Sequence, residues 1–153
     1  MNKLKTIIFT IIFLAFVSCK EDNKTVQEKL TITDFKEVPN EIDGCSCFFS
    51  ETEKKYNSNE YLIATNLDSI AFVSLNNKII KLKLVEKKIE PNSIDNENYT
   101  AIFANKKYKA TIEVKEDRTK KNADEVWWNI GTIKVEDKNG NQQTKKFIGE
   151  CGC

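Results

Sequence analysis

Histidine is absent from all 153 residues of the chain, and its absence excludes several kinds of active site. Without imidazole there is no Ser-His-Asp triad, no Cys-His nucleophile and no zinc site with a histidine ligand. The Cys-x-x-Cys spacing of thiol oxidoreductases is also missing. No convincing amphipathic helix and no internal repeat of the solenoid kind can be found.

An excess of basic charge is missing as well. Once residues 1–18 are removed as a signal peptide, Lys3 and Lys5 are lost, and 22 basic residues face 23 acidic ones. A nearly neutral chain has no global field to attract nucleic acid, and none of the nucleic-acid recognition motifs is present. Nucleic acid is therefore not expected as a partner.

The sequence begins instead with a secretion signal. Two lysines are followed by an apolar run, Ile7 to Val17, which is shorter than the roughly 20 apolar residues that span a bilayer. Val17-Ser18-Cys19 resembles the cleavage site of bacterial lipoproteins, with Phe16 where leucine is usual. The resemblance implies cleavage before Cys19 and lipid, including palmitate, on its sulfur. An ordinary signal peptide, or an anchor helix that happens to end in cysteine, is the alternative.

The lipoprotein resemblance sets the expected domain organisation. Residues 1–18 are the expected signal peptide, residues 19–30 a lipidated cysteine and flexible tether, and residues 31–153 one β-barrel-like domain. Lys20-Glu21-Asp22 resembles the surface-export tag of lipoproteins from Bacteroidota, although a solvated linker would look much the same. We therefore expect a protein attached to the outer membrane through lipid on Cys19, at the cell surface.

The domain shows the two-residue alternation of half-buried strands. From Ile80 to Leu84 and from Tyr108 to Val114, apolar residues alternate with lysine, threonine or glutamate. Turn signals follow at Asn76-Asn77, Asn105-Lys106 and Asn139-Gly140, because asparagine and glycine tolerate positive φ. These patterns predict an all-β fold, a small antiparallel meander of about eight strands that closes like a barrel.

The strand that contains both tryptophans shows a change of phase. Apolar residues fall on even positions from Val126 to Ile130 and on odd positions from Gly131 to Val135. A bulge at Gly131 is predicted to absorb this slip. Trp128 is then expected in the core. Trp127 is expected either as an exposed platform for a glycan or protein ligand, or packed under a loop.

Two Cys-x-Cys motifs, Cys45-Ser46-Cys47 and Cys151-Gly152-Cys153, stand at the two ends of the domain. With Cys19 assigned to lipid, the remaining four cysteines are an even number in an oxidising compartment, which favours disulfides. Residues two apart on a strand share a face, so the motifs can meet and close the sheet. Antiparallel docking predicts Cys45–Cys153 and Cys47–Cys151; parallel docking predicts Cys45–Cys151 and Cys47–Cys153.

Two other arrangements of the four cysteines remain open. Four thiolates can hold one Zn or Cu(I) ion, although structural zinc sites usually separate their ligands by about two to four residues. Alternatively, each motif can form its own strained, easily reduced bridge and act as a redox pair. Only the metal site needs a cofactor, and with disulfides between the motifs none is expected.

Other features of the sequence give weaker evidence of binding than the cysteines and tryptophans. A set of lysines on the predicted strands could form a basic face for anionic polysaccharide or lipid headgroups, or be the solvated side of the sheet. These lysines are Lys81, Lys83, Lys87, Lys88, Lys107, Lys109 and Lys115. The polar loops Glu86–Asn98 and Asp117–Asp124 are the places where function is expected. Asp68-Ser69-Ile70 resembles the O-glycosylation acceptor triplet of Bacteroidota.

Gly44-Cys45-Ser46-Cys47-Phe48-Phe49 and Gly149-Glu150-Cys151-Gly152-Cys153 together resemble a group of Bacteroidota lipoproteins with no known activity. The resemblance covers most of the domain. It implies the compartment of the protein and the closure of its sheet, and it implies no activity. A small secreted barrel that ends in cysteine is also similar to membrane-bound inhibitors of c-type lysozyme, although their Ser-Gly and Thr-Lys-Gly loops are missing here.

The expected function is that of a non-enzymatic binding or structural module of the envelope. A thiol-based metal-binding or redox protein is the main alternative, and an inhibitor of a lysozyme-like enzyme is the second. A hydrolase comes last, because the plentiful acidic residues include no pair that its surroundings mark as a catalytic dyad.

Overall fold

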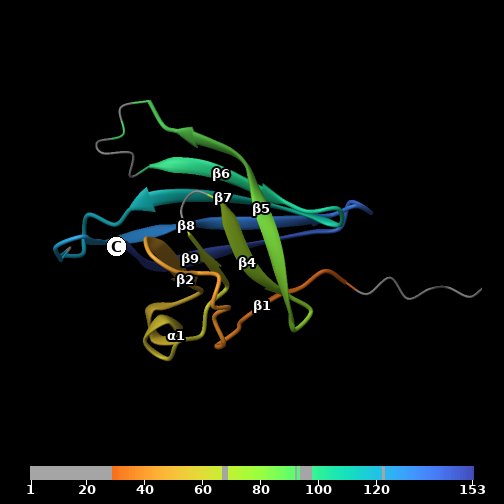
Figure 1. Ribbon diagram of the computed structural model, residues 1–153, viewed down its shortest axis with the longest axis horizontal. Helices are drawn as coiled ribbons and strands as arrows, with labels where there is room; N and C mark the ends of the chain where they lie inside the picture. The colour runs from red at the N-terminus through yellow and green to blue at the C-terminus, as the bar shows by residue number, and fades with distance from the viewer. Residues whose placement is uncertain (1–28, 67–68, 92, 94–97, 122) are drawn as a thin grey trace, which may run out of the picture.

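The computed structural model describes residues 29–66, 69–91, 93, 98–121 and 123–153, which form one antiparallel sheet closed into a barrel (Figure 1). The predicted signal peptide, Cys19, the export tag and nearly all of the predicted tether lie outside these residues. In the part of the chain that is described, no helix is long and apolar enough to cross a membrane.

Eight strands follow one another around the barrel as a simple meander. They are β2 (Ser46–Ser50), β3 (Ile63–Thr65), β4 (Ile70–Leu75), β5 (Lys78–Ile89), β6 (Tyr99–Ala104), β7 (Tyr108–Glu116), β8 (Val126–Asp137) and β9 (Gln142–Gly152). Each pairs antiparallel with the next, and β9 pairs with β2 to close the barrel. A further strand, β1 (Ile32–Thr33), pairs with the end of β4. The predicted all-β, barrel-like meander is confirmed.

Tight turns join the strands at one end of the barrel. Asn76 and Asn77 both have positive φ, 49° and 61°, and Gly140 has φ of 85°. Asn105 accepts hydrogen bonds from the backbone N–H groups of Lys107 and Tyr108, at 2.8 and 2.9 Å. These are the turns that the sequence predicts. We call this end the hairpin end and the opposite end, which carries the four cysteines, the disulfide end.

Side chains at alternate positions fill the barrel. Phe49, Leu82, Phe103, Ile112 and Ile133 are each at most 1% exposed. Burying one such side chain stabilises a fold by about 1.5–3 kcal/mol, so this interior is the main source of stability. A second, outer cluster lies on β3 and β4, where the chain before β2 covers apolar side chains.

The predicted bulge at Gly131 is wrong. β8 pairs with both β7 and β9 without a register shift, so its odd positions face the interior throughout. Gly131 is needed for space: a Cβ there would lie 2.6 Å from Cζ of Phe147 and 1.9 Å from the carbonyl oxygen of Glu113. The barrel's register shift lies instead in β5, between Leu84 and Glu86.

One short helix, α1 (Glu53–Asn57), was not predicted. The Thr52 side chain caps it by accepting a hydrogen bond from the backbone N–H of Lys55 at 3.2 Å. Lys55 in turn forms ion pairs with Asp34 and Glu51, each at 2.7 Å, and these hydrogen bonds raise its pKa to about 12. The network ties α1 to the segment after β1 and holds the helix against the outside of the barrel.

Candidate binding groove at the disulfide end

Two disulfides cross the seam between β2 and β9, where the barrel closes. The bonds are Cys45–Cys153 and Cys47–Cys151, each with a Cα–Cα separation of 4.0 Å. Of the two pairings left open by the sequence, this is the one that antiparallel docking predicts. The two bridges differ in exposure: Cys47 and Cys151 are buried inside the barrel, whereas Cys45 and Cys153 are exposed on its rim.

All four of these cysteines are held in bonds between the two motifs rather than within one motif. A Zn or Cu(I) site on them would first require both bonds to be reduced. Among the described residues, no group of three or more Cys, Asp or Glu side chains is arranged to hold a metal ion. A measurement of free thiols therefore separates the disulfide arrangement from the metal site, and peptide mapping separates it from bridges within each motif.

A groove of about 280 Å³ lies on the outer surface beside the exposed bridge. It is lined by Gly44, Ser46, Phe48, Tyr56, Val126, Glu150, Cys151, Gly152 and Cys153. Residues from β2, α1, β8 and β9 thus meet here, so the groove depends on the closed seam. We call it the disulfide-end groove.

The polar centre of this groove is a hydrogen bond between α1 and β9. The hydroxyl of Tyr56 donates to Oε2 of Glu150 at 2.8 Å. Burial raises the pKa of Tyr56, and the hydrogen bond to Glu150 and its negative charge raise it further. The phenol therefore stays protonated at physiological pH. Because a carboxylate can accept several hydrogen bonds, Glu150 keeps the capacity to bind a ligand hydroxyl or N–H.

Aromatic side chains continue from the groove across the outer surface. The ring of Tyr56 lies 5.2 Å from that of Trp128 and 5.9 Å from that of Tyr61. Lys120 lies over the Trp128 ring, 4.5 Å from its centroid, and forms an ion pair with Glu53 of α1 at 2.6 Å. Trp128 is thus packed between an aromatic ring and a cation.

Trp127 faces the interior of the barrel and Trp128 faces outward, the reverse of the predicted orientation. Trp127 lies opposite Cys151, faces the interior and packs, half-buried, against the core. The placement of Trp128 in the core is therefore wrong, and on the same outer face Ile130 is 42% exposed. The continuous register of β8 explains the error. The aromatic side chains on the outer face beside the groove are Tyr56 and Trp128, both half-buried, rather than Trp127.

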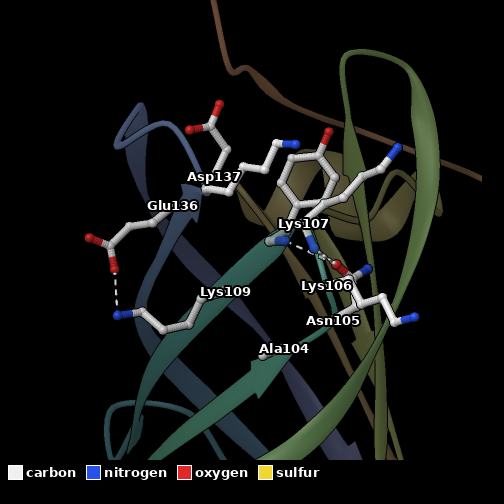
Figure 2. Close-up of a pocket in the computed structure, with 9 residues that line it drawn as sticks. Ala104, Asn105, Lys106, Lys107, Lys109, Glu136 and Asp137 are labelled. Atoms are coloured by element: carbon white, nitrogen blue, oxygen red, sulfur yellow. Dashed lines mark hydrogen bonds and ion pairs between the residues drawn. The ribbon is translucent and has the colours of Figure 1, made fainter.

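A second groove, of about 330 Å³, lies at the hairpin end, between the β6–β7 and β8–β9 turns (Figure 2). It is lined by Ala104, Asn105, Lys106, Lys107, Tyr108, Lys109, Glu136, Asp137 and Lys138. Lys109 pairs with Glu136 at 2.8 Å, and the side chain of Asn141 donates to Asp137 at 2.8 Å. These two contacts hold the pKa of both carboxyls below their ordinary values.

Lysines of the candidate basic face pair with glutamates, as is typical of the solvated side of a sheet. The ion pairs are Lys81–Glu41, Lys88–Glu86 and Lys115–Glu90. Lys87 lies over the Tyr99 ring, 4.7 Å from its centroid. Ser69 of the predicted glycosylation triplet is exposed, and Asp68 lies outside the described residues.

Comparison of the chain with models of protein families, with curated proteins and with solved structures finds no match. Tyr56 and Glu150, which form the polar centre of the groove, were not singled out from the sequence. The one local signal was Thr52, a favourable N-cap residue just before α1. Function must therefore be inferred from the geometry of the site.

Proposed function

We propose that this protein is a lipid-anchored envelope protein of the outer membrane, exposed at the cell surface, that acts as a non-enzymatic binding module. Lipid on Cys19 attaches it to the membrane. The disulfide-end groove binds the ligand, a glycan or a segment of another protein.

The main support for this proposal is the hydrogen-bonded pair of Tyr56 and Glu150, which lies beside the exposed Cys45–Cys153 bridge. Binding sites typically combine apolar and aromatic walls with a few fixed polar groups that orient the ligand. Here Phe48 and Tyr56 supply aromatic surface, and Glu150 supplies a fixed acceptor. Tyrosine and tryptophan suit such surfaces because they bury a large apolar area while keeping a polar group in contact with the ligand.

The same lining favours binding over catalysis. Enzymes that cleave glycosidic bonds usually place two carboxyl groups about 5–9.5 Å apart, whereas the residues lining this groove include one acidic side chain, Glu150. The raised pKa of Tyr56 keeps its phenol in the neutral form, which is a hydrogen-bond donor and a poor general base.

Glu150→Gln and Tyr56→Phe should each weaken ligand binding by about tenfold or more, because a hydrogen bond to a charged group contributes about 1.5–3 kcal/mol. A glycan array and a pull-down from envelope extracts identify the ligand, and titration then gives its Kd for each variant. Ile130→Ala, on the outer face of the same barrel, is the matched control and should leave the Kd unchanged. Wild-type affinity in both groove variants would place the ligand elsewhere.

Cys19→Ser should abolish anchoring, since the thioether to lipid cannot form on serine. The precursor should remain uncleaved by the lipoprotein peptidase, and metabolic labelling with a fatty-acid probe should fall to background. Cys45→Ala, which leaves Cys19 intact, serves as the control for the loss of one cysteine. If the Cys19→Ser protein is labelled as strongly as wild type, the lipid is attached at another residue.

A further inference from the structure

The described chain enters the barrel at the hairpin end. Leu30 and Ile32 are buried, at 4% and 1% exposure. The N–H of Thr31 donates to Oδ1 of Asn76 at 2.8 Å, and the N–H of Asn76 donates to the carbonyl of Thr31 at 2.8 Å. The start of the domain is therefore fixed to the β4–β5 turn. In Figure 1 this start and the β6–β7 and β8–β9 turns lie on one side, and the C-terminus lies on the other.

The same end presents lysines that have no carboxylate partner among the described residues. Lys106 and Lys107 lie in the β6–β7 turn and Lys138 in the β8–β9 turn, and all three are exposed. The two turns are joined by a hydrogen bond from the N–H of Lys138 to the carbonyl of Lys107, at 3.1 Å. Of the acids beside them, Glu136 pairs with Lys109 (Figure 2), and Asp137 accepts a hydrogen bond from the side chain of Asn141. The structure thus holds three cationic side chains together on one end.

The length of chain before the barrel limits how the domain can sit on a membrane. Ten residues separate Cys19 from Leu30, and even fully extended they span at most about 35 Å. β8 alone has 12 residues, about 40 Å of strand, and with the usual tilt of barrel strands it covers roughly 30 Å along the barrel axis. Placing the disulfide end against the membrane would require this segment to run almost fully extended along the whole barrel. The hairpin end lies at the membrane without any such constraint.

We propose that the hairpin end docks on the phosphate layer of the bilayer that holds the protein's own lipid. Lys106, Lys107 and Lys138 contact the lipid phosphates, and the disulfide-end groove points away from the membrane. The inference rests on the lipid anchor of the proposed function, because the anchor brings this end to the surface. Lysines near an anionic surface are attracted over about a Debye length, so the anchor and the three lysines act together.

The test uses the lipidated protein, purified from membranes and reconstituted into vesicles of phosphatidylcholine alone or with about 30% phosphatidylglycerol. The rate at which an amine reagent labels each lysine is then read by mass spectrometry. Labelling of Lys106, Lys107 and Lys138 should be about threefold or more slower in the anionic vesicles. Lys88, Lys115 and Lys121, from the opposite halves of the strands and the connection after β7, should label at equal rates in both.

A charge-reversal variant then tests the three lysines themselves. Lys78, the first residue of β5, lies at the same end and should also be protected in the anionic vesicles. Lys106→Glu, Lys107→Glu and Lys138→Glu together should remove this protection. The same reversal at Lys88, Lys115 and Lys121 changes the net charge equally and should leave Lys78 protected. Inorganic phosphate added to the protein in detergent should protect none of these lysines, which separates lipid phosphate from free phosphate.

Failure of the lipid anchor and failure of the docking give different results. Protein that does not float with the vesicles lacks the anchor, which contradicts the proposed function itself. Protein that floats but labels identically in both kinds of vesicle, or is slowed equally at both ends, contradicts docking through the hairpin end while leaving the anchor intact.

Discussion

Replacing Cys45, Cys47, Cys151 and Cys153 with alanine is expected to lower the free energy of unfolding by about 6–8 kcal/mol, from loop closure and lost packing together. The two bridges join residues 108 and 104 positions apart, and closing a loop of about 100 residues contributes roughly 4.7 kcal/mol in the chain-entropy model. The second bridge adds much less, because the first has already closed the loop. Urea unfolding followed by circular dichroism measures the difference.

The two double variants separate loop closure from packing. Cys45→Ala with Cys153→Ala keeps the buried bridge and removes exposed sulfur, so it should cost less than about 1 kcal/mol. Cys47→Ala with Cys151→Ala also keeps one bridge, but it removes sulfur from positions that are 0% and 1% exposed. Lost packing should then cost about 1–3 kcal/mol more than the rim variant. A four-alanine variant as stable as wild type would mean that the disulfides do not hold the seam closed.

Gly149→Ala is expected to be the most damaging single substitution at the seam, at about 3 kcal/mol. A Cβ at this position would lie 1.9 Å from the carbonyl oxygen of Phe48 and 2.9 Å from Cα of Phe49. Both are backbone atoms of β2, so neither can move aside as a side chain would. Relief requires β2 and β9 to separate, where their pairing closes the barrel.

Gly44→Asn is the matched control for that substitution. Gly44 has φ of 66°, and nothing lies within 4 Å of the position its Cβ would take. Asparagine tolerates this backbone conformation better than other residues with a Cβ, so the cost should stay below about 1 kcal/mol. Equal destabilisation by the two substitutions, measured by thermal unfolding, would show that the close approach of β2 to β9 is not what Gly149 is needed for.

The architecture was predictable from local sequence because its turns are local. Asn76-Asn77 and Asn139-Gly140 specify their hairpins through residues that accept positive φ, whatever the rest of the chain does. The closure was predictable for a different reason: paired cysteines at the two ends report a long-range contact directly. Together these two kinds of signal were enough for the barrel and its closure by the two motifs, whereas the choice between the two pairings needed the register of β2 and β9.

The candidate groove was not predictable, because long-range packing decides which face of β8 is inside. Even positions from Val126 to Ile130 look like a core face, yet Trp128 is covered from outside by Tyr56 and Lys120. Helix α1, which supplies Tyr56, has five residues, too few for a helical period to be visible. Gly131 suggested a bulge, but what it provides is space for the ring of Phe147.

The central claim is that the four barrel cysteines close the seam and do not work as thiols. Intact-mass measurement with and without alkylation, made on protein purified without reductant, tests it most directly, together with elemental analysis and peptide mapping. Trypsin should release residues 37–54 joined to residues 147–153, and fragmentation between Cys45 and Cys47 should assign the bonds as Cys45–Cys153 and Cys47–Cys151. We expect no free thiol and no stoichiometric metal. Four thiols that become alkylatable only after chelation would establish a metal site instead, and bonds confined within each Cys-x-Cys motif would establish a redox pair.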